Sequence, residues 1–440
     1  MADNSMTASE NKTIDPLNSC IAQMLAEIPS DTRNTIPKGK VEMMAESLWT
    51  WFKQTDGATV RLRAAEGIDA DLLGHFVLEA VGPDRPFLVD SLLGACSDLG
   101  HDVLTLFHPI VELEDGAHSL IQIYLPDLSK AEQAELLKEA AATLKDVIVS
   151  TSDYRAMRAK MTEEIDRLKS SDHVSARYKD EAVAFLQWLG QERFVFLGAR
   201  SYTFQTGPDG AVLQEEPDMV EGSNLGLLRD EDRNVLNRGA EPLLLTKEIG
   251  AFLAEPETLI LAKATLFSRV HRRVDCDYVG VKHYGANGEV IGETRFLGLY
   301  TAEAYNESVR NIPLLRRRME RVLNMLEVLP GSHNEKAISN IIEGWPRDEL
   351  IQTKSETLAP IMQGVLDLVA RPRVRVFSRP DRFNRFVSTV VFVPREAYDT
   401  DLRKHIADAI ENAWGGRMTT FQPSFDGATM VRVLFQTTLP

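Results

Sequence analysis

The sequence lacks the short motifs through which one chain usually binds a nucleotide or a metal. No two of its 27 glycines are separated by a single residue, so neither a dinucleotide-binding G-x-G-x-x-G nor a kinase glycine-rich loop is present. The phosphate loop G-x-x-x-x-G-K-[ST] and the nucleophile elbow G-x-S-x-G are also missing. The nine histidines never lie three or four residues apart, which excludes a helical H-x-x-x-H metal site. We therefore predict no catalytic, cofactor-binding or metal site, and favour binding, regulation or assembly over catalysis.

Cysteines and long apolar runs are also scarce. Cys20, Cys96 and Cys276 are too few for a disulfide framework or a four-cysteine zinc site, which favours a reducing compartment. No apolar run approaches the ~18 residues that span a bilayer, and the polar start lacks the layout of a secretory signal. The net charge of −16 gives no general attraction to nucleic acid or anionic lipid. We expect a cytoplasmic protein with neither nucleic acid nor a membrane as its partner.

A chain of 440 residues with 44% hydrophobic residues has room for several packed domains. Residues 1–69 are expected to form a disordered start and two short amphipathic helices, at 17–28 and 41–52. Residues 70–152 then alternate in the order βαββαβ, the ferredoxin-like plan with both helices on one face of an antiparallel sheet. Its expected elements are a strand at 75–81, a helix at 89–99, strands at 103–113 and 120–125, a helix capped by Ser129 and Glu132, and a strand at 147–149. Ile121, Ile123 and Leu125 alternate along one of these strands and predict a surface that pairs with a second copy.

The remaining 290 or so positions divide by their hydrophobic period. Residues 153–184 favour a helical connector, and from Phe194 the period changes to two. Over 185–302 the order is two strands joined by a turn at 207–210, a weakly helical stretch at 215–250, and strands at 259–274, 278–284 and 290–299. This is the order of a PAS-like module. Residues 303–369 are helical again, and 371–440 predict a second small α/β sandwich. The predicted fold class is α+β and multi-domain.

Two groups of residues are candidate binding sites. The turn with Gly82, Asp84 and Arg85 could present main-chain amides at a helix start to an effector carboxylate, although ordinary turn and cap chemistry explains the same residues. Arg371, Arg373 and Arg375 alternate with valines, which places them on one face of a predicted strand. They form either an anion-binding or interface patch or a solvated, edge-protecting face, and we favour the solvated face.

Two further clusters have less specific patterns. A second basic run, at helical spacing, consists of Arg310, Arg316, Arg317, Arg318 and Arg321, and in so acidic a chain both arginine groups favour contact with acidic protein surface over nucleic acid. Arg269, His271 and Arg273 are predicted on one strand face near Cys276. A thiol catalyst there would need a paired base and an oxyanion donor, and neither can be named, so a structural role is favoured.

The segment GPDRPFLVDSLLGACSDLGHDVLTLFHPIVEL resembles an ACT domain, the βαββαβ module that senses amino acids in metabolic enzymes. Phe87 departs from that family, because it stands where the D-R-P-G-L-L helix start has a glycine. Collinear stretches such as RFVFLGARSYTF, GSHNEKAISNIIEGWPRDEL and RPRVRVFSRPDRFNRFVSTVVFVPREAY resemble the N-terminal half of the large bacterial NAD-specific glutamate dehydrogenases. The resemblance covers roughly residues 70–440.

This resemblance implies a parent enzyme that converts glutamate, NAD and water to 2-oxoglutarate, ammonium and NADH, with its catalytic domain outside this chain. The chain itself would be a regulatory and oligomerisation region, with ACT-like modules at 70–152 and 371–440, a PAS-like module at 185–302 and a helical segment at 303–369. Its partners would be the C-terminal catalytic region, a second copy of the chain and an amino-acid effector. The alternative is a free-standing amino-acid-sensing ACT protein that acts on a partner enzyme, and a hydrolase or redox enzyme at Cys276 ranks third. Phe87 is expected to block amino-acid binding at the Gly82 to Phe87 loop and to make a packing or assembly contact instead.

Overall fold

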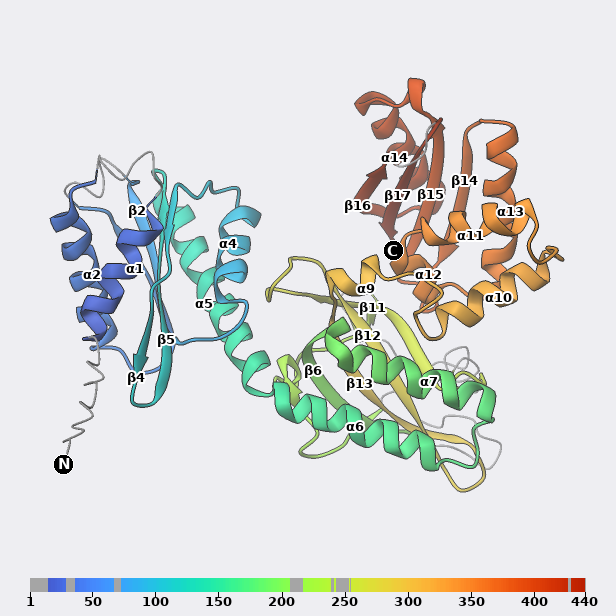
Figure 1. Ribbon diagram of the computed structural model, residues 1–440, viewed down its shortest axis with the longest axis horizontal. Helices are drawn as coiled ribbons and strands as arrows, with labels where there is room; N and C mark the ends of the chain where they lie inside the picture. Colours follow the sequence, from blue (N-terminus) through green and yellow to red (C-terminus); the bar gives the residue numbers. More distant parts are fainter. Residues whose placement is uncertain are drawn as a thin grey trace, which may run out of the picture. The chain divides into compact units, whose positions relative to one another are not determined.

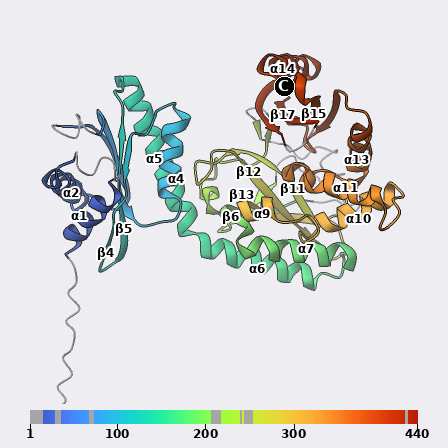
Figure 2. The same ribbon diagram turned by 45° about the horizontal axis from the view of Figure 1, so that its top comes forward.

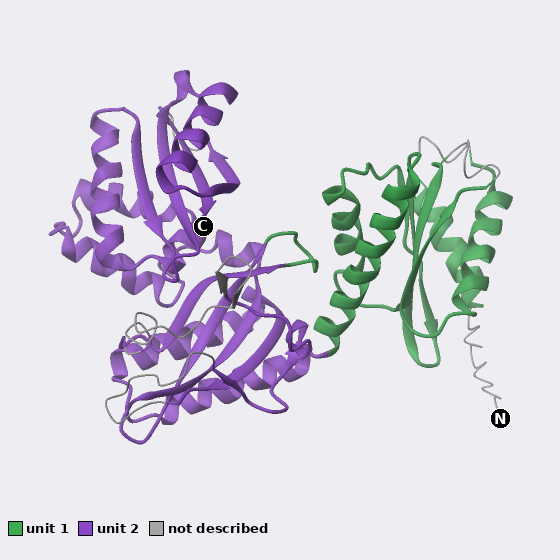
Figure 3. Cartoon of the chain, turned by 180° about the vertical axis from the view of Figure 1, so that it is seen from behind, with its two compact units in different colours: residues 1–152, 268–274 green, residues 153–267, 275–440 purple. Residues whose placement is uncertain are grey.

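The computed structural model describes residues 15–28, 36–66, 73–205, 217–238, 241–242, 253, 255–425 and 429–439, and it divides into two compact units (Figure 3). Unit 1 comprises residues 1–152 and 268–274, and unit 2 comprises residues 153–267 and 275–440. The predicted disordered start, up to residue 14, and the predicted turn at 207–210 lie outside the described residues. Within the described ranges, none of the helices combines the length and apolarity needed to cross a membrane.

A five-stranded antiparallel sheet forms the centre of unit 1, in the order β1-β2-β5-β3, with β4 also paired to β5. The strand predicted at 103–113 is interrupted at His108 and Pro109 and gives β3 and β4. β1 was not predicted, although it pairs with β2 along its whole length. The strands are β1 (Thr59–Ala64), β2 (Phe76–Pro83), β3 (Thr105–Phe107), β4 (Ile110–Leu113) and β5 (Gly116–Leu125).

Helices cover both faces of this sheet, as the blue and green helices on its two sides show (Figure 1). One face packs Val77, Val81 and Tyr124 against the predicted N-terminal helices α1 and α2. The opposite face lies toward α4 and α5, and there Ile121, Ile123 and Leu125 are buried. The expectation that these three residues form an exposed pairing surface is therefore wrong. The helices are α1 (Pro16–Glu27), α2 (Lys38–Phe52), α4 (Leu88–Asp98) and α5 (Lys130–Ser152).

Helix α5 begins as predicted and ends later than predicted. Ser129 and Glu132 form the expected capping box, since the Ser129 N–H donates to the Glu132 carboxylate at 2.7 Å and the Glu132 N–H donates to Ser129 Oγ at 3.3 Å. The strand predicted at 147–149 is wrong, because the buried stripe of Leu136, Ala140 and Leu144 continues at helical spacing to Val147. The ferredoxin-like order is thus completed by β1, which lies beside β2 at the edge of the sheet, and not by a strand after α5.

The first half of unit 2 is a six-stranded antiparallel sheet in the order β11-β12-β13-β6-β7, with β8 paired to β6. Its core includes Phe196, Val279 and Phe296, packed with Met157 of α6 and Phe185 of α7. The strand predicted at 259–274 ends at Phe267. The elements are α6 (Tyr154–Ser170), α7 (Ala176–Trp188), β6 (Phe194–Thr203), β7 (Asp218–Met219), β8 (Leu225–Gly226), β11 (Leu259–Phe267), β12 (Asp275–Tyr284) and β13 (Val290–Tyr300), with a two-residue pair β9 (Asn237–Arg238) and β10 (Glu241–Pro242).

The second half of unit 2 contains the predicted helical segment and a four-stranded antiparallel sheet in the order β14-β15-β17-β16. One face of this sheet packs Val391, Val433 and Phe435 with Ile410 of α14. On the other face Phe392 stacks on Trp345, with ring centroids 6.2 Å apart. The elements are α9 (Ala302–Asn306), α10 (Leu315–Met325), α11 (His333–Glu343), α12 (Arg347–Gln352), α13 (Ser355–Ala370), β14 (Arg375–Pro380), β15 (Phe386–Pro394), α14 (Thr400–Trp414), β16 (Arg417–Ser424) and β17 (Met430–Thr438).

Candidate functional site

The predicted effector loop connects β2 to α4 in unit 1. Its main chain is held to β5, since the Asp84 N–H donates to the Ala117 carbonyl at 2.8 Å and the Asp84 carboxylate accepts from Ser119 Oγ at 2.6 Å. Gly82 has φ 153°, and a Cβ there would come within 2.7 Å of Ala58 Cα. Arg85 is half-buried in the same loop. The hydrogen bonds of Asp84 to β5 and the short distance between Gly82 and Ala58 are typical of a closely packed turn.

Phe87 caps α4 in a left-handed main-chain conformation, with φ 72° and ψ 2°. Glycine adopts this conformation without strain, whereas any residue with a side chain loses stability in it. This is a second physical reason why ACT domains usually have a glycine where this chain has Phe87. The half-buried ring lies 4.8 Å from the imidazole of His271, measured between centroids. The Phe87 carbonyl accepts from the Ser91 N–H at 3.0 Å, which begins the helix. Phe87 therefore makes a packing contact with residues 268–274.

Residues 268–274 connect β11 to β12 and belong to unit 1, so the predicted strand face of Arg269, His271 and Arg273 does not exist. The His271 N–H donates to Ser91 Oγ at 2.9 Å, and His271 itself has φ 64°. Both arginines donate to Glu139 of α5, at 2.9 Å from Arg269 and 2.6 Å from Arg273. Burial raises the pKa of Glu139, but these two hydrogen bonds and charges outweigh it and lower the pKa below its ordinary value.

The structural role favoured for Cys276 stays a prediction. Cys276 is completely buried near the start of β12, two residues beyond the segment 268–274. Among the residues that the structure describes, no group of three or more histidine, cysteine, aspartate or glutamate side chains could hold a metal ion.

The arginine patch 371, 373 and 375 is not one strand face. β14 begins at Arg375, so Arg371 and Arg373 are exposed residues of the segment that follows α13, while the Arg375 guanidinium lies 5.8 Å from the Phe377 ring centroid. Farther along, the charge is neutralised in buried pairs. Arg379 donates twice to Glu349, both at 2.8 Å, and Arg385 donates to Asp381 at 2.7 and 3.1 Å. The run of positive charge seen in the sequence is therefore divided between solvent, buried ion pairs and a cavity.

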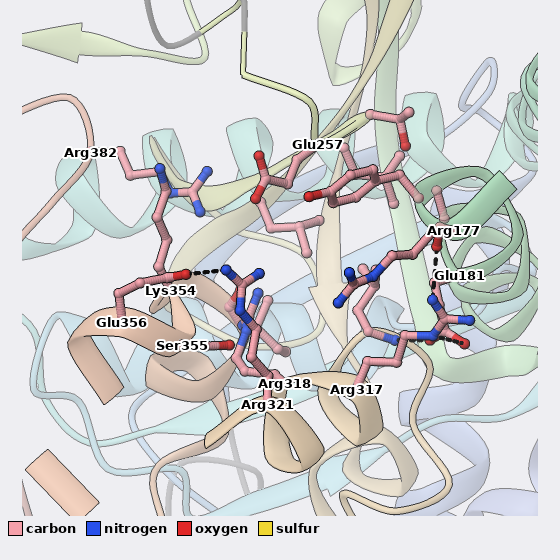
Figure 4. A pocket seen from close by; sticks show the side chains of 17 residues that line it. Arg177, Glu181, Glu257, Arg317, Arg318, Arg321, Lys354, Ser355, Glu356 and Arg382 are labelled. Atoms are coloured by element: carbon pink, nitrogen blue, oxygen red, sulfur yellow. Dashed lines mark hydrogen bonds and ion pairs between the residues drawn. The ribbon is translucent and has the colours of Figure 1, made fainter. Parts of the chain in front are cut away.

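That cavity lies inside unit 2 and has a volume of about 130 Å³. Figure 4 shows Arg382 and Arg177 on opposite sides of it, with Arg318 and Arg321 between them. The cavity is bounded by α7, β11, α10 and the start of α13, which brings together residues from 177 to 382. The basic run at 316–321 was a sequence signal for part of it. Only the fold adds the residues of α7, β11 and the 382 loop. The six cationic side chains that line it are those of Arg177, Arg317, Arg318, Arg321, Lys354 and Arg382.

Two half-buried arginines, Arg318 and Arg382, are among the charged groups that line this cavity. Burial and the neighbouring charge of Arg382 lower the pKa of Arg318 to about 10, and burial also lowers the pKa of Arg382 against the opposing effects of Glu255 and Glu257. Arg318 donates to the main-chain carbonyls of Leu350 and, at 2.9 Å, Ile351 in the last turn of α12. The positive charge of Arg382 thus disfavours the charged form of Arg318.

Comparison with known proteins adds family matches to three parts of the chain. Residues 20–165 match the family model for the glutamate dehydrogenase ACT1 domain, 312–371 that for glutamate dehydrogenase helical motif 1, and 375–440 that for the glutamate dehydrogenase ACT2 domain. The first match extends well beyond the segment 70–152 and includes most of α1 and all of α2 and β1.

Whole proteins with similar sequences are also known. The chain is 31% identical over 415 residues to an NAD-specific glutamate dehydrogenase of Halomonas elongata, a match that covers 88% of this chain and 25% of that protein. It is 30% identical over 384 residues to the NAD-specific glutamate dehydrogenase of Pseudomonas aeruginosa, covering 82% of this chain and 23% of that protein. The corresponding protein of Mycobacterium tuberculosis is 28% identical over 309 residues. The chain spans about a quarter of the length of the first two curated relatives.

Proposed function

Because the chain belongs to the NAD-specific glutamate dehydrogenase family, we propose that it forms the N-terminal regulatory and oligomerisation region of such an enzyme. The observation that carries the proposal is the pair of ACT family matches in a chain that spans only a quarter of its relatives. The longer protein would oxidise glutamate with NAD and water to 2-oxoglutarate, ammonium and NADH. Its catalytic groups and its NAD site would lie outside residues 1–440, in the cytoplasm like the region described here.

The ACT1 domain is proposed to be a structural unit, in which the loop of Gly82, Asp84, Arg85 and Phe87 makes contacts and does not take an amino acid. Two features support this role. The Phe87 ring packs on His271, and the hydrogen bond from the His271 N–H to Ser91 Oγ holds residues 268–274 over the start of α4. An amino acid at this loop would have to displace both contacts.

For residues 185–302 we propose a PAS-like module. The strand order supports the assignment, because β6, the first strand, lies beside β13, the last, with β12 and β11 following outward and β7 on the other side. The same proposal divides the rest of the chain into a connector at 153–184, a helical segment at 303–369 and the second ACT-like domain at 371–440.

Self-association is proposed to use the ACT2 sheet. β16 is an edge strand whose residues are mostly exposed, and Phe421 on it and Phe425 just beyond it are 43% and 48% exposed. An unpaired strand edge with exposed aromatic side chains is a ready surface for pairing with another chain. The Arg371, Arg373 and Arg375 segment leads into β14, at the opposite edge of the same sheet, where it would form a separate interface or remain solvated.

The test is to compare the product of the complete gene with a version that lacks residues 1–440. The proposal predicts that the shortened protein loses its native oligomeric state or its response to effectors, measured by light scattering and by NADH formation at varied effector concentration. A shortened protein that keeps the same mass distribution and the same effector response would contradict the proposal. A gene that ends at Pro440 would contradict it more directly.

A further inference from the structure

The two ACT sheets of the chain share one topology, so their elements can be compared one by one. The ACT1 order β1-β2-β5-β3 is the same as the ACT2 order β14-β15-β17-β16, and neighbouring strands in both orders are antiparallel. α4 follows the second strand of ACT1, and α14 follows the second strand of ACT2. In ACT1 a further helix, α5, follows β5 after residues 126–129 and packs against both β1 and α4. β17 is the counterpart of β5 and ends at Thr438, so a counterpart of α5 would begin beyond residue 440.

The ACT2 sheet exposes apolar side chains on the face that α14 covers. α14 packs against β17 and β16, at one side of the sheet (Figure 2). On β14, at the other side, Val376 pairs with Val391 and therefore shares the face on which α14 lies. Val376 is 53% exposed, and Val374, which alternates with it just before the strand, is 57% exposed. In ACT1, α5 packs against the equivalent strand β1, and Val60 and Leu62 there are half-buried.

One flank of α14 is also apolar and open. Glu411 marks the flank that faces β16, because its carboxylate accepts a hydrogen bond from the Met418 N–H at 2.6 Å. Helical spacing places four apolar residues on the opposite flank, two of them half-buried and two exposed. They are Leu402, Ile406, Ala409 and Ala413. α14 buries only Ile410 among its 15 residues, whereas α4, beside α5, buries five of its 11.

A helix is the occupant that fits this surface. In unit 1 the equivalent place beside β1 and α4 is taken by α5, a helix of 23 residues whose buried stripe includes Leu136, Ala140 and Leu144. A second copy of the chain fits less well. A symmetric contact at β14 would bring the exposed Arg371 and Arg373 of both copies to one interface and place like charges together.

We propose that the open part of the α14 face is covered by an amphipathic helix formed by the residues that directly follow Pro440 in the longer protein. This helix would lie beside α14 and over β14, and would bury Val374 and Val376. It would make ACT2 the link between residues 1–440 and the rest of the enzyme. The inference rests on the proposed function, in which the chain is the first part of a protein about four times as long, since it spans about a quarter of its first two curated relatives.

The proposal is tested by thiol labelling under native conditions of Val376→Cys in two proteins. One is the 440-residue chain, and the other extends beyond Pro440 by a connector and one helix of the length of α5, 23 residues. The native cysteines are all buried, so background labelling should be low. The introduced thiol should react readily in the 440-residue chain and roughly tenfold more slowly or less in the extended protein, where labelling needs the helix to open.

Two further variants make the labelling specific. Val374→Cys is a second probe of the same surface and should be protected in the same way. Leu329→Cys is the control, because Leu329 is 74% exposed and lies outside the ACT2 sheet, so its labelling rate should be equal in both proteins. Circular dichroism and thermal melting verify that each variant folds.

Three results would overturn the proposal. The first is equal labelling of Val376→Cys in the 440-residue and extended proteins. The second is protection that appears in the 440-residue chain as its concentration rises, which assigns the surface to a second copy. The third is protection found only in the complete gene product, which assigns the surface to a more distant part of the protein. All three leave the oligomeric-state and effector tests of the proposed function unaffected, whereas a gene that ends at Pro440 refutes the proposed function itself.

Discussion

The left-handed conformation of Phe87 gives the sharpest mutational prediction. Its φ of 72° lies in the region that costs an L-residue roughly 1–2 kcal/mol, and its side chain is half-buried against His271. Replacing this residue by alanine removes the ring and keeps the strain, whereas replacing it by glycine removes the ring and relieves the strain. The two variants therefore separate the packing of the ring from the conformation of the main chain.

The magnitudes follow from the structure. Truncation of a fully buried phenylalanine to alanine costs about 3–5 kcal/mol, so a half-buried ring should cost roughly 1.5–2.5 kcal/mol in Phe87→Ala. Glycine recovers the left-handed strain but adds about 0.5–1 kcal/mol of unfolded-chain entropy. Phe87→Gly should consequently be more stable than Phe87→Ala by about 1 kcal/mol.

Phe76 provides a matched control in the same unit. It is also half-buried, but it lies in the extended strand β2, where glycine has no conformational advantage. There the order should reverse, with Phe76→Gly less stable than Phe76→Ala by about 0.5–1 kcal/mol. The stability difference between the glycine and the alanine variant is therefore expected to have opposite signs at positions 87 and 76.

Hydrogen exchange measured by mass spectrometry is the suitable assay, because it reports the opening free energy of each peptide in a chain of several domains. Peptides from α4 and from residues 268–274 should exchange faster in Phe87→Ala than in Phe87→Gly. If the two Phe87 variants are equally protected, or if alanine is better protected than glycine, the argument from main-chain strain is refuted.

Two other predictions concern the pH dependence of unit 1 and self-association. Because the pKa of Glu139 is lowered in the folded protein, its carboxylate stabilises the fold fully above the ordinary pKa of 4.5, and this stabilisation is lost as the pH falls through the lower folded pKa. Acid should therefore release residues 268–274, seen as faster hydrogen exchange. Glu139→Gln should speed their exchange at neutral pH and remove the acid-dependent step, and an unchanged acid profile in this variant would contradict the role of Glu139. On the ACT2 edge, Phe421→Glu should reduce self-association in light scattering, because it places a charge on exposed strand β16, and an unaltered oligomer would exclude this edge as the contact.

Hydrophobic period determined how much of the fold was predictable. The stripe of α4 and the capping box of α5 were both read correctly, since short-range spacing specifies them. The run Val147–Val149 was misread because its β-branched residues favour a strand, although the buried stripe of α5 reaches Val147. β1 was missed, although Val60 and Leu62 alternate with Arg61 and Arg63; the two arginines pair with the buried Glu79 of β2, a long-range contact that no local pattern reveals.

The candidate sites were less predictable than the fold. The alternation of Arg269, His271 and Arg273 has the period of a strand, but Glu139, more than a hundred residues earlier, binds both arginines in a loop. The cavity is lined by Arg177 of α7, Arg318 of α10 and Arg382 of the loop between β14 and β15, which lie far apart along the chain. Spacing in one sequence cannot report such convergence, because it depends on how helices and sheets pack.

The central claim is that residues 1–440 regulate and assemble an enzyme and do not carry its catalytic groups. It is tested most directly by incubating the purified 440-residue chain with glutamate and NAD, following NADH absorbance, and titrating NAD calorimetrically. A pyrophosphate needs close glycine approach at a helix N-terminus, and no G-x-G occurs in the sequence. The account predicts no NADH formation and no saturable NAD binding at micromolar concentrations. Glutamate-dependent NADH formation by this chain alone would contradict it.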